Sequence, residues 1–132
     1  MTILSQTETP NEFAQVVTLG AHTLRADVSE ANGGKDLGPS PHDLFDASLA
    51  ACKTTTAHWY AKRANMPLER VECSVERDDS KEREGVYKLT VKLAYFGPLT
   101  PEQRTKLHSA VMRCPLHKLM TTTEVVIETA PL

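Results

Sequence analysis

The stretch SPHDLFDASLAACKTTTAHWYAKRAN, residues 40–65, decides the fold because it predicts one long helix with a sharply defined start. Ser40 suits the N-cap, Pro41 suits the first helical position, and Asp43 completes a capping box with Ser40. Residues 44–52 carry small side chains on several faces, so the helix needs packing partners on more than one side. The few strands of a short chain bury such a helix poorly, whereas a second copy of the chain in a homodimer would bury its remaining faces.

Two strands are predicted after this helix, which ends near Asn65 because asparagine and a nearby proline stop helices. Apolar and polar residues alternate over residues 71–76 and again over residues 86–95. This alternation has the period of a half-buried strand. The charged residues 77–85 between the two runs predict a solvated hairpin loop.

The C-terminal third is predicted to hold two helices and a strand. Thr100 opens a helix by the same capping logic. That helix breaks at Cys114, since a residue that precedes a proline disfavours helical backbone. A short helix is then expected over residues 115–121, and a last strand over residues 124–130.

The N-terminal third is predicted to be a hairpin followed by a loop. Alternation over residues 12–28, with Gly20 at the turn, indicates two antiparallel strands. Residues 29–40 form a loop rich in glycine and proline, and residues 1–11 are expected to be flexible or to lead into a strand. Strands and helices are grouped rather than strictly alternating, so residues 1–132 are expected to form a single α+β domain.

The composition fits an ordinary globular protein and excludes some classes of partner. Fifteen basic residues against seventeen acidic ones give a net charge of −2, and no stretch concentrates Lys and Arg. Binding to nucleic acid or to an anionic membrane through a strong positive field is therefore not expected. The start of the chain lacks the features of a signal peptide, and no apolar run approaches the ~20 residues of a spanning helix. We expect a cytoplasmic protein whose thiols are reduced.

Two of the three cysteines are candidates for chemistry. Cys114 is predicted at the start of a short helix, where free N–H groups and the helix dipole favour a thiolate, and Arg113 and His117 add nearby cations. Cys52 lies in the long helix beside small residues that let another element approach its sulfur. Each also has a structural interpretation, as a buried thiol beside a proline kink or as core filling. Cys73 alternates with apolar strand residues and is interpreted as core.

A structural zinc site is a minor alternative. His42, His58, His108 and His117 would have to join the cysteines, yet C-x-x-H occurs once and C-x-x-C does not occur. We therefore expect no bound metal.

Three motifs, taken together, resemble one known family. The helix opens with GPSPHDLF (residues 38–45) and continues to AAC (residues 50–52), and RCPLHK (residues 113–118) follows much later. In this order the chain is similar, from about residue 12 onward, to the OsmC/Ohr family of osmotically induced proteins and organic hydroperoxide resistance enzymes. The paired cysteine motifs are specific, whereas either one alone would not be.

The resemblance implies an intertwined homodimer in which antiparallel sheets wrap around long central helices. It also implies a thiol peroxidase of oxidative and osmotic stress defence, with its sites at the subunit interface. Cys52 would be the peroxidatic residue, which attacks an organic hydroperoxide and becomes a sulfenic acid, and Cys114 the resolving residue, which forms a disulfide with it. An external dithiol such as dihydrolipoamide would reduce that disulfide, and no bound cofactor is implied.

The supporting residues depart from the pattern of the family's peroxidases. Those proteins have a glutamate ten positions before the first cysteine, where this chain has His42, and the adjacent Asp43 is the acid that would substitute for it. They also have an arginine before the helix that lowers the thiol pKa, and here Arg25 or Lys35 would have to replace it. An ordinary cysteine, with a pKa of ~8.5, is only about a few per cent thiolate at pH 7.

The same departures favour a second hypothesis from a different class. On this hypothesis the chain is a non-enzymatic dimer whose interface pocket holds a small apolar ligand or senses redox state.

Overall fold

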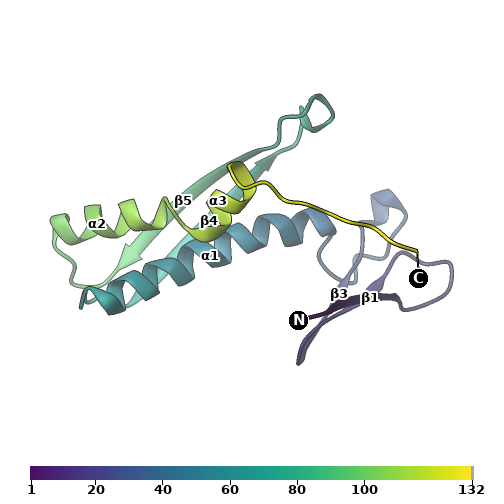
Figure 1. The fold of residues 1–132 in the computed structure, drawn as a ribbon, viewed down its shortest axis with the longest axis horizontal. Coiled ribbons are helices and arrows are strands. Elements are labelled where there is room, and N and C mark those ends of the chain that lie inside the picture. The colour runs from purple at the N-terminus through teal and green to yellow at the C-terminus, as the bar shows by residue number, and fades with distance from the viewer. Residues whose placement is uncertain (132) are drawn as a thin grey trace. The chain divides into compact units, whose positions relative to one another are not determined.

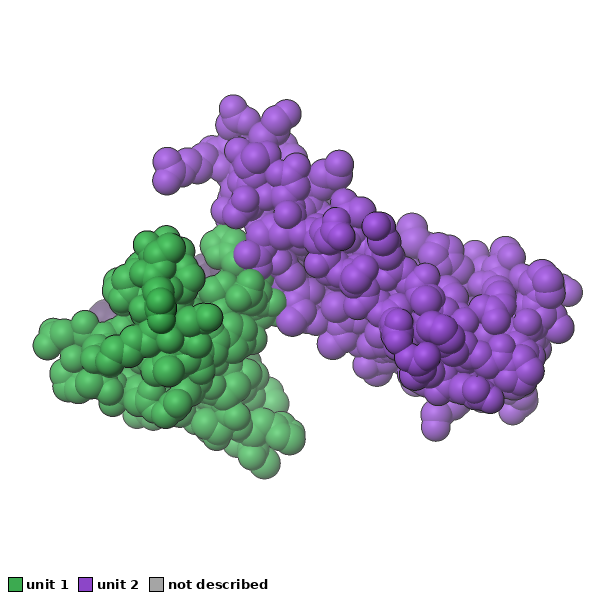
Figure 2. Space-filling view, turned by 180° about the vertical axis from the view of Figure 1, so that it is seen from behind, with its two compact units in different colours: residues 1–45 green, residues 46–132 purple. Residues whose placement is uncertain are grey.

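The computed structural model describes residues 1–131, and the chain divides into two compact units, residues 1–45 and residues 46–132 (Figure 2). Helices and antiparallel strands occur together, so the predicted α+β class is confirmed (Figure 1). Within residues 1–131, no helix combines the length and the apolar composition that crossing a membrane requires.

The first unit contains a three-stranded antiparallel sheet in the order β1-β2-β3. Its strands are β1 (Ile3–Thr7), β2 (Gln15–Leu19) and β3 (His22–Ala26). The predicted hairpin is confirmed: Leu19 pairs with His22 across a two-residue turn, and Gly20 at that turn has a φ of 61°, which glycine adopts at little cost. Residues 1–11 were expected to be flexible or to lead into a strand, and within them β1 itself forms and pairs with β2 along its whole length.

A buried carboxylate organises the loop that follows β3, which includes the short 3₁₀ helix η1 (Glu30–Asn32). The Asp27 side chain accepts hydrogen bonds from the backbone N–H groups of Val28, Lys35 and Leu37, at 2.7, 3.2 and 3.1 Å. These bonds, led by the one from Leu37, hold the pKa of Asp27 below its ordinary value. The loop is therefore irregular in backbone but fixed by its own hydrogen bonds.

The long helix α1 (Pro41–Arg63) begins as predicted. The backbone N–H of Asp43 donates to the Ser40 hydroxyl at 3.1 Å, and the backbone N–H of Ser40 donates to the Asp43 carboxylate at 3.0 Å. Both bonds of the capping box are present, so two N–H groups that a helix start leaves unpaired are satisfied.

The end of α1 lies two residues before the predicted end, and Asn65 still terminates it. Asn65 has a φ of 54°, in the left-handed region that closes helices. The backbone N–H of Met66 donates to the Ala61 carbonyl at 2.8 Å, and that of Asn65 donates to the Lys62 carbonyl at 3.4 Å. This is the Schellman arrangement, which satisfies carbonyls of the last turn and reverses the chain.

The second unit contains an antiparallel hairpin of β4 (Arg70–Asp78) and β5 (Lys88–Phe96). Half-buried and exposed residues alternate along both strands, as predicted. The connecting loop, residues 79–87 with the 3₁₀ helix η2 (Glu82–Glu84), lies two residues later than expected, because β4 continues to Asp78 and β5 begins at Lys88.

Two further helices complete the second unit, α2 (Pro101–Val111) and α3 (Pro115–Thr121). Thr100 caps α2 through a full capping box with Gln103. Cys114 is the N-cap of α3 in extended backbone, with φ −60° and ψ 150°. The predicted break before Pro115 is therefore confirmed.

The core of this unit forms where α1 packs against α2 and the hairpin, which run beside it in Figure 1. The most buried members come from the two helices: Ala57, Ala61, Leu107 and Val111. Partly buried side chains of the hairpin and its connections surround them, including Val71, Leu93 and Tyr95. The small residues of α1 thus allow a close approach to α2 on this face.

A polar cluster ties the first half of α1 to the hairpin. Asp46 is largely buried and accepts a hydrogen bond from Arg77 Nε at 2.6 Å and one from the Tyr87 hydroxyl at 2.7 Å. Burial, together with the hydrogen bond to Asp46, raises the pKa of Tyr87 to about 12. The carboxylate is thus the acceptor shared by Arg77 of β4 and by Tyr87, the residue that precedes β5.

Replacing Asp46 with alanine is expected to lower the free energy of unfolding by about 2–3 kcal/mol, because Arg77 and Tyr87 lose their acceptor in a partly buried place. Chemical denaturation followed by circular dichroism measures this change. The matched control is Asp79→Ala at an exposed loop position, where we expect less than about 0.5 kcal/mol. Equal effects of the two substitutions would contradict the role given to Asp46.

The prediction of a last strand over residues 124–130 is wrong for the described residues. Residues 124–131 are extended but pair with no other strand among residues 1–131. A strand requires a neighbour for its hydrogen-bond ladder, and alternation alone does not provide one. Val125, Val126 and Ile127 are therefore 59%, 73% and 83% exposed.

Candidate functional site

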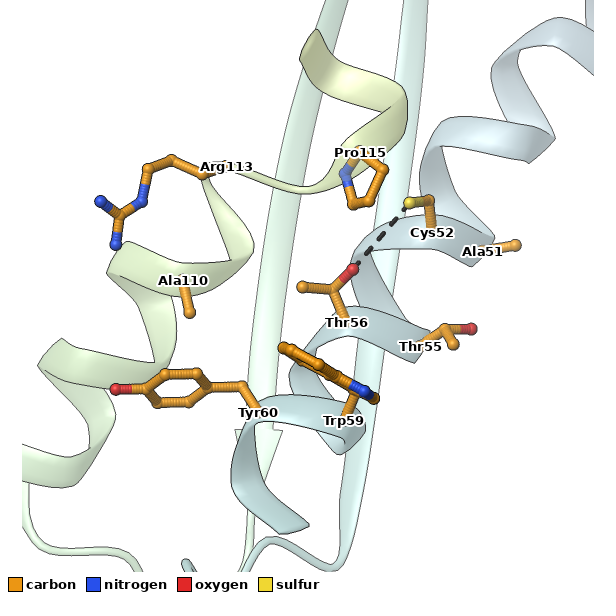
Figure 3. A pocket seen from close by; sticks show the side chains of 9 residues that line it. All are labelled: Ala51, Cys52, Thr55, Thr56, Trp59, Tyr60, Ala110, Arg113 and Pro115. Atoms are coloured by element: carbon orange, nitrogen blue, oxygen red, sulfur yellow. Dashed lines mark hydrogen bonds between the residues drawn. The ribbon is translucent and has the colours of Figure 1, made fainter. Parts of the chain in front are cut away.

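Cys52 lies on α1 and faces a cavity of about 670 Å³ in the second unit. The sulfur is half-buried and points toward the side of the cavity where Pro115 lies (Figure 3). The lining comes from α1, from the end of α2 and from the start of α3: Ala51, Cys52, Thr55, Thr56, Trp59, Tyr60, Ala110, Arg113 and Pro115. The volume is in the range of sites that bind small molecules.

The cavity is mainly apolar, with few polar groups near the sulfur. Cys52 Sγ lies 3.9 Å from Thr56 Oγ1, and either atom can donate. Arg113 is the one charged residue of the lining, and Figure 3 shows its guanidinium directed away from Cys52. The Cys52 sulfur is therefore surrounded by apolar side chains and the Thr56 hydroxyl, and Arg113 lies at the rim of the cavity.

Trp59 forms an open wall of this cavity. Trp59 is the only tryptophan of the chain and is 57% exposed, which is high for such a large apolar side chain. The guanidinium of Arg63, one turn further along α1, lies 4.7 Å from the centre of the indole ring. This cation–π contact holds the ring in place at the cavity mouth.

Cys114 is fully buried and is not itself among the residues that line this cavity. Its backbone N–H donates to the Val111 carbonyl at 3.2 Å, which closes the turn between α2 and α3. Its two sequence neighbours, Arg113 and Pro115, both line the cavity that Cys52 faces. The structure thus brings the segments of both predicted cysteines to one cavity, although they are far apart in the sequence.

A buried lysine beside Cys114 is a site feature that sequence reasoning missed. Lys53 is only 2% exposed, and its Nζ donates to the Val111 carbonyl at 3.1 Å. The same Nζ lies 3.4 Å from Nδ1 of His117, a predicted supporting residue. The four-residue spacing in the sequence could have revealed its burial. Lys53 lies midway between Leu49 and Ala57 on the buried face of α1.

The remaining predicted residues, Arg25, Lys35, His42 and Asp43, lie in the first unit. Arg25 pairs with Glu8, with Nε 3.0 Å from the carboxylate, and Lys35 pairs with Glu12 at 2.8 Å. The hydrogen bond to Glu12 raises the pKa of Lys35.

Asp43 forms the capping box, and His42 is exposed in the first turn of α1. The cations expected to replace the family arginine thus have carboxylate partners within their own unit.

Cys73 occupies the core-facing side of β4, as predicted, and all three cysteines are free thiols. Burial raises the pKa of the Cys73 thiol, while the positive charge of Lys53 lowers it and the sulfur of Cys114 raises it. Lys53, Cys73 and Cys114 therefore lie within electrostatic range of one another. Among residues 1–131, no three His, Cys, Asp or Glu side chains are placed to hold a metal ion.

Comparisons with known proteins identify the family of this chain. A family model described as OsmC-like protein matches residues 33–130. The comparison with curated protein sequences gave no significant match.

Solved structures with the same fold include an OsmC-like protein from Mycoplasma pneumoniae, 17% identical with a TM-score of 0.73 over 92% of this chain and 86% of that one. The organic hydroperoxide resistance protein OhrB of Bacillus subtilis is 23% identical, with a TM-score of 0.60 over 92% of both chains. An organic hydroperoxide resistance protein from Elizabethkingia anophelis is 20% identical, with a TM-score of 0.63 over 92% of this chain and 89% of that one. With the family model covering most of its length, the chain belongs to the OsmC-like protein family.

Proposed function

We propose that this protein is a cysteine-based peroxidase that reduces organic hydroperoxides to alcohols in defence against oxidative or osmotic stress. The observation that carries the proposal is the position of Cys52 on an apolar cavity whose wall includes both sequence neighbours of Cys114. An apolar cavity accommodates the organic part of a hydroperoxide, and a thiolate attacks its oxygen. Names of structural neighbours that include organic hydroperoxide resistance agree with this proposal.

The proposed reaction has two steps on the protein. The Cys52 thiolate attacks the terminal oxygen, the O–O bond breaks, and the leaving alkoxide takes a proton to become the alcohol, so that sulfur is oxidised to a sulfenic acid. The Cys114 thiolate then attacks the Cys52 sulfur, the S–S bond forms, the S–O bond breaks, and hydroxide leaves as water after taking a proton. An external dithiol, such as dihydrolipoamide, reduces the disulfide by thiol exchange.

Arg113 is the residue that supplies positive charge to the cavity. Its side chain is exposed, and it is the one charged residue among the lining residues. Rotation of this long side chain brings the guanidinium toward the Cys52 sulfur when a peroxide enters. This role replaces the one that the sequence assigned to Arg25 or Lys35.

The active form is a homodimer. Exposed apolar side chains such as Trp59, Val126 and Ile127 are costly in a monomer, and the extended segment around Ile127 has backbone groups available for a strand partner. A second copy of the chain would cover this surface and narrow the mouth of the cavity.

A second candidate function is binding of a small apolar ligand without turnover. It is favoured by the surroundings of the Cys52 sulfur. Among residues 1–131 its one polar partner is the Thr56 hydroxyl, and no cation contacts it. Native mass spectrometry that finds a bound apolar molecule, together with no peroxide consumption, would support this function.

The test of the peroxidase proposal is peroxide loss from a mixture of reduced protein, dihydrolipoamide and cumene hydroperoxide. We expect catalytic consumption, and a second-order rate constant at least about tenfold higher than with hydrogen peroxide, because the cumyl ring removes apolar surface from water in the cavity. Loss no faster than in the protein-free mixture would contradict the proposal. Equal rates with both peroxides would contradict the role given to the cavity.

A further inference from the structure

Lys53 is a buried cation whose place in the fold calls for an explanation. Lys53 is 2% exposed, and within residues 1–131 its polar partners are the Val111 carbonyl and the His117 ring, with no carboxylate. Burying an ammonium group without a negative partner is expensive, and an apolar residue would fill the same slot of α1 at lower cost. Buried charged residues of this kind cluster at functional sites, where their charge acts on a neighbouring group.

The partners of Lys53 place its charge beside Cys114. The Val111 carbonyl accepts hydrogen bonds both from Lys53 Nζ, at 3.1 Å, and from the Cys114 backbone N–H, at 3.2 Å. The ammonium group therefore lies within two hydrogen-bond lengths of the Cys114 backbone. His117 follows one turn later on α3, and its Nδ1 lies 3.4 Å from Lys53 Nζ.

We propose that Lys53 is a positioning residue for Cys114, which fixes the turn between α2 and α3 and supplies the positive charge that favours the Cys114 thiolate. The inference rests on the proposed peroxidase cycle, in which Cys114 attacks the oxidised Cys52. A fully buried thiol ionises readily only when a cation lies nearby, because burial disfavours the charged form. Lys53 is a buried cation whose Nζ is hydrogen-bonded to the turn that carries Cys114.

Other titratable groups face Lys53 from each element around it. They are His117 from α3, Cys114 from the turn between α2 and α3, and Cys73 from β4. Burial raises the pKa of the Cys73 thiol and so disfavours the thiolate at that sulfur. The favourable charge of Lys53 is therefore available to Cys114.

The first test separates the two steps of the cycle. Reduced wild type, Lys53→Met and Lys53→Arg receive one equivalent of cumene hydroperoxide, and dimedone added at successive times traps the Cys52 sulfenic acid for mass spectrometry. We expect Lys53→Met to slow disulfide formation about tenfold or more, while formation of the sulfenic acid stays within about twofold. Lys53→Arg should recover much of the disulfide rate. The matched control is Lys62→Met at an exposed position of the same helix, which should behave as wild type.

The second test does not depend on peroxide and so distinguishes failure of this inference from failure of the proposed function. In a Cys52→Ser, Cys73→Ser background, thiolate absorbance near 240 nm comes from Cys114 alone. Adding Lys53→Met should lower this absorbance severalfold at about pH 8, whereas adding Lys62→Met should leave it unchanged. Lys53→Gln retains a hydrogen-bond donor without charge, and it provides the same comparison if the methionine variant does not fold. Equal absorbance in the Lys53 and Lys62 variants would overturn the inference.

Discussion

Cys52→Ser is expected to lower the rate of dithiol-dependent peroxide consumption about a thousandfold or more. A serine hydroxyl has almost the size of the thiol but does not ionise near neutral pH and is a poor nucleophile toward a peroxide oxygen. The measurement is loss of cumene hydroperoxide with dihydrolipoamide in excess, at several protein concentrations. The folded state should be retained, since the side chain is only half-buried.

Cys73→Ser is the matched control for this experiment. Cys73 is also half-buried, but it faces the core from β4 and is not among the residues that line the cavity. We expect its variant to keep the wild-type rate within about twofold. Equal rates for the Cys52 variant and wild type would exclude a nucleophilic role for Cys52.

Leu107→Ala is expected to lower the free energy of unfolding by about 2–5 kcal/mol. Leu107 is fully buried between α1, α2 and the hairpin. Truncation there removes apolar contacts and leaves a cavity that close-packed neighbours fill only in part. Urea denaturation followed by far-ultraviolet circular dichroism, at one fixed protein concentration, measures the change.

Leu119→Ala supplies the comparison, because Leu119 is 43% exposed on α3. Its loss should cost less than about 1 kcal/mol, since much of the side chain is already in water. If both leucine variants lost the same stability, the described core would not be the centre of the second unit.

Local signals explain why much of the fold was predictable from the sequence. The capping box at Ser40, the capping box at Thr100 and the proline after Cys114 each act within a few residues, and each is found where it was expected. Alternation identified β4 and β5 because one face of the hairpin packs against helices. These features depend little on distant parts of the chain.

The features that the sequence did not predict depend on partners far along the chain. The pairing of β1 (Ile3–Thr7) needs β2, and the expected strand over residues 124–130 lacks a neighbour in the described residues. The buried Lys53 was missed because charged side chains are ordinarily on the surface. Its burial depends on the Val111 carbonyl, which only the packing of α2 against α1 brings within reach.

The candidate site was also predictable only where a single segment carries the signal. Cys52 and Cys114 stand in recognisable motifs, whereas the cavity that Cys52 faces is assembled from three helices and so has no signature in one segment. The replacement cations proposed from the sequence, Arg25 and Lys35, have carboxylate partners of their own. Arg113, named for its place beside Cys114, also lines the cavity that Cys52 faces.

Mapping of disulfides after one equivalent of cumene hydroperoxide tests the central claim most directly. Trypsin places the three cysteines on separate peptides, residues 36–53 for Cys52, residues 71–77 for Cys73 and residues 114–118 for Cys114. Digestion without reductant should yield the first and third peptides joined by a Cys52–Cys114 bond, with Cys73 free. Three free thiols, or a Cys52 oxidised to sulfinic acid with no bridge, would contradict the account.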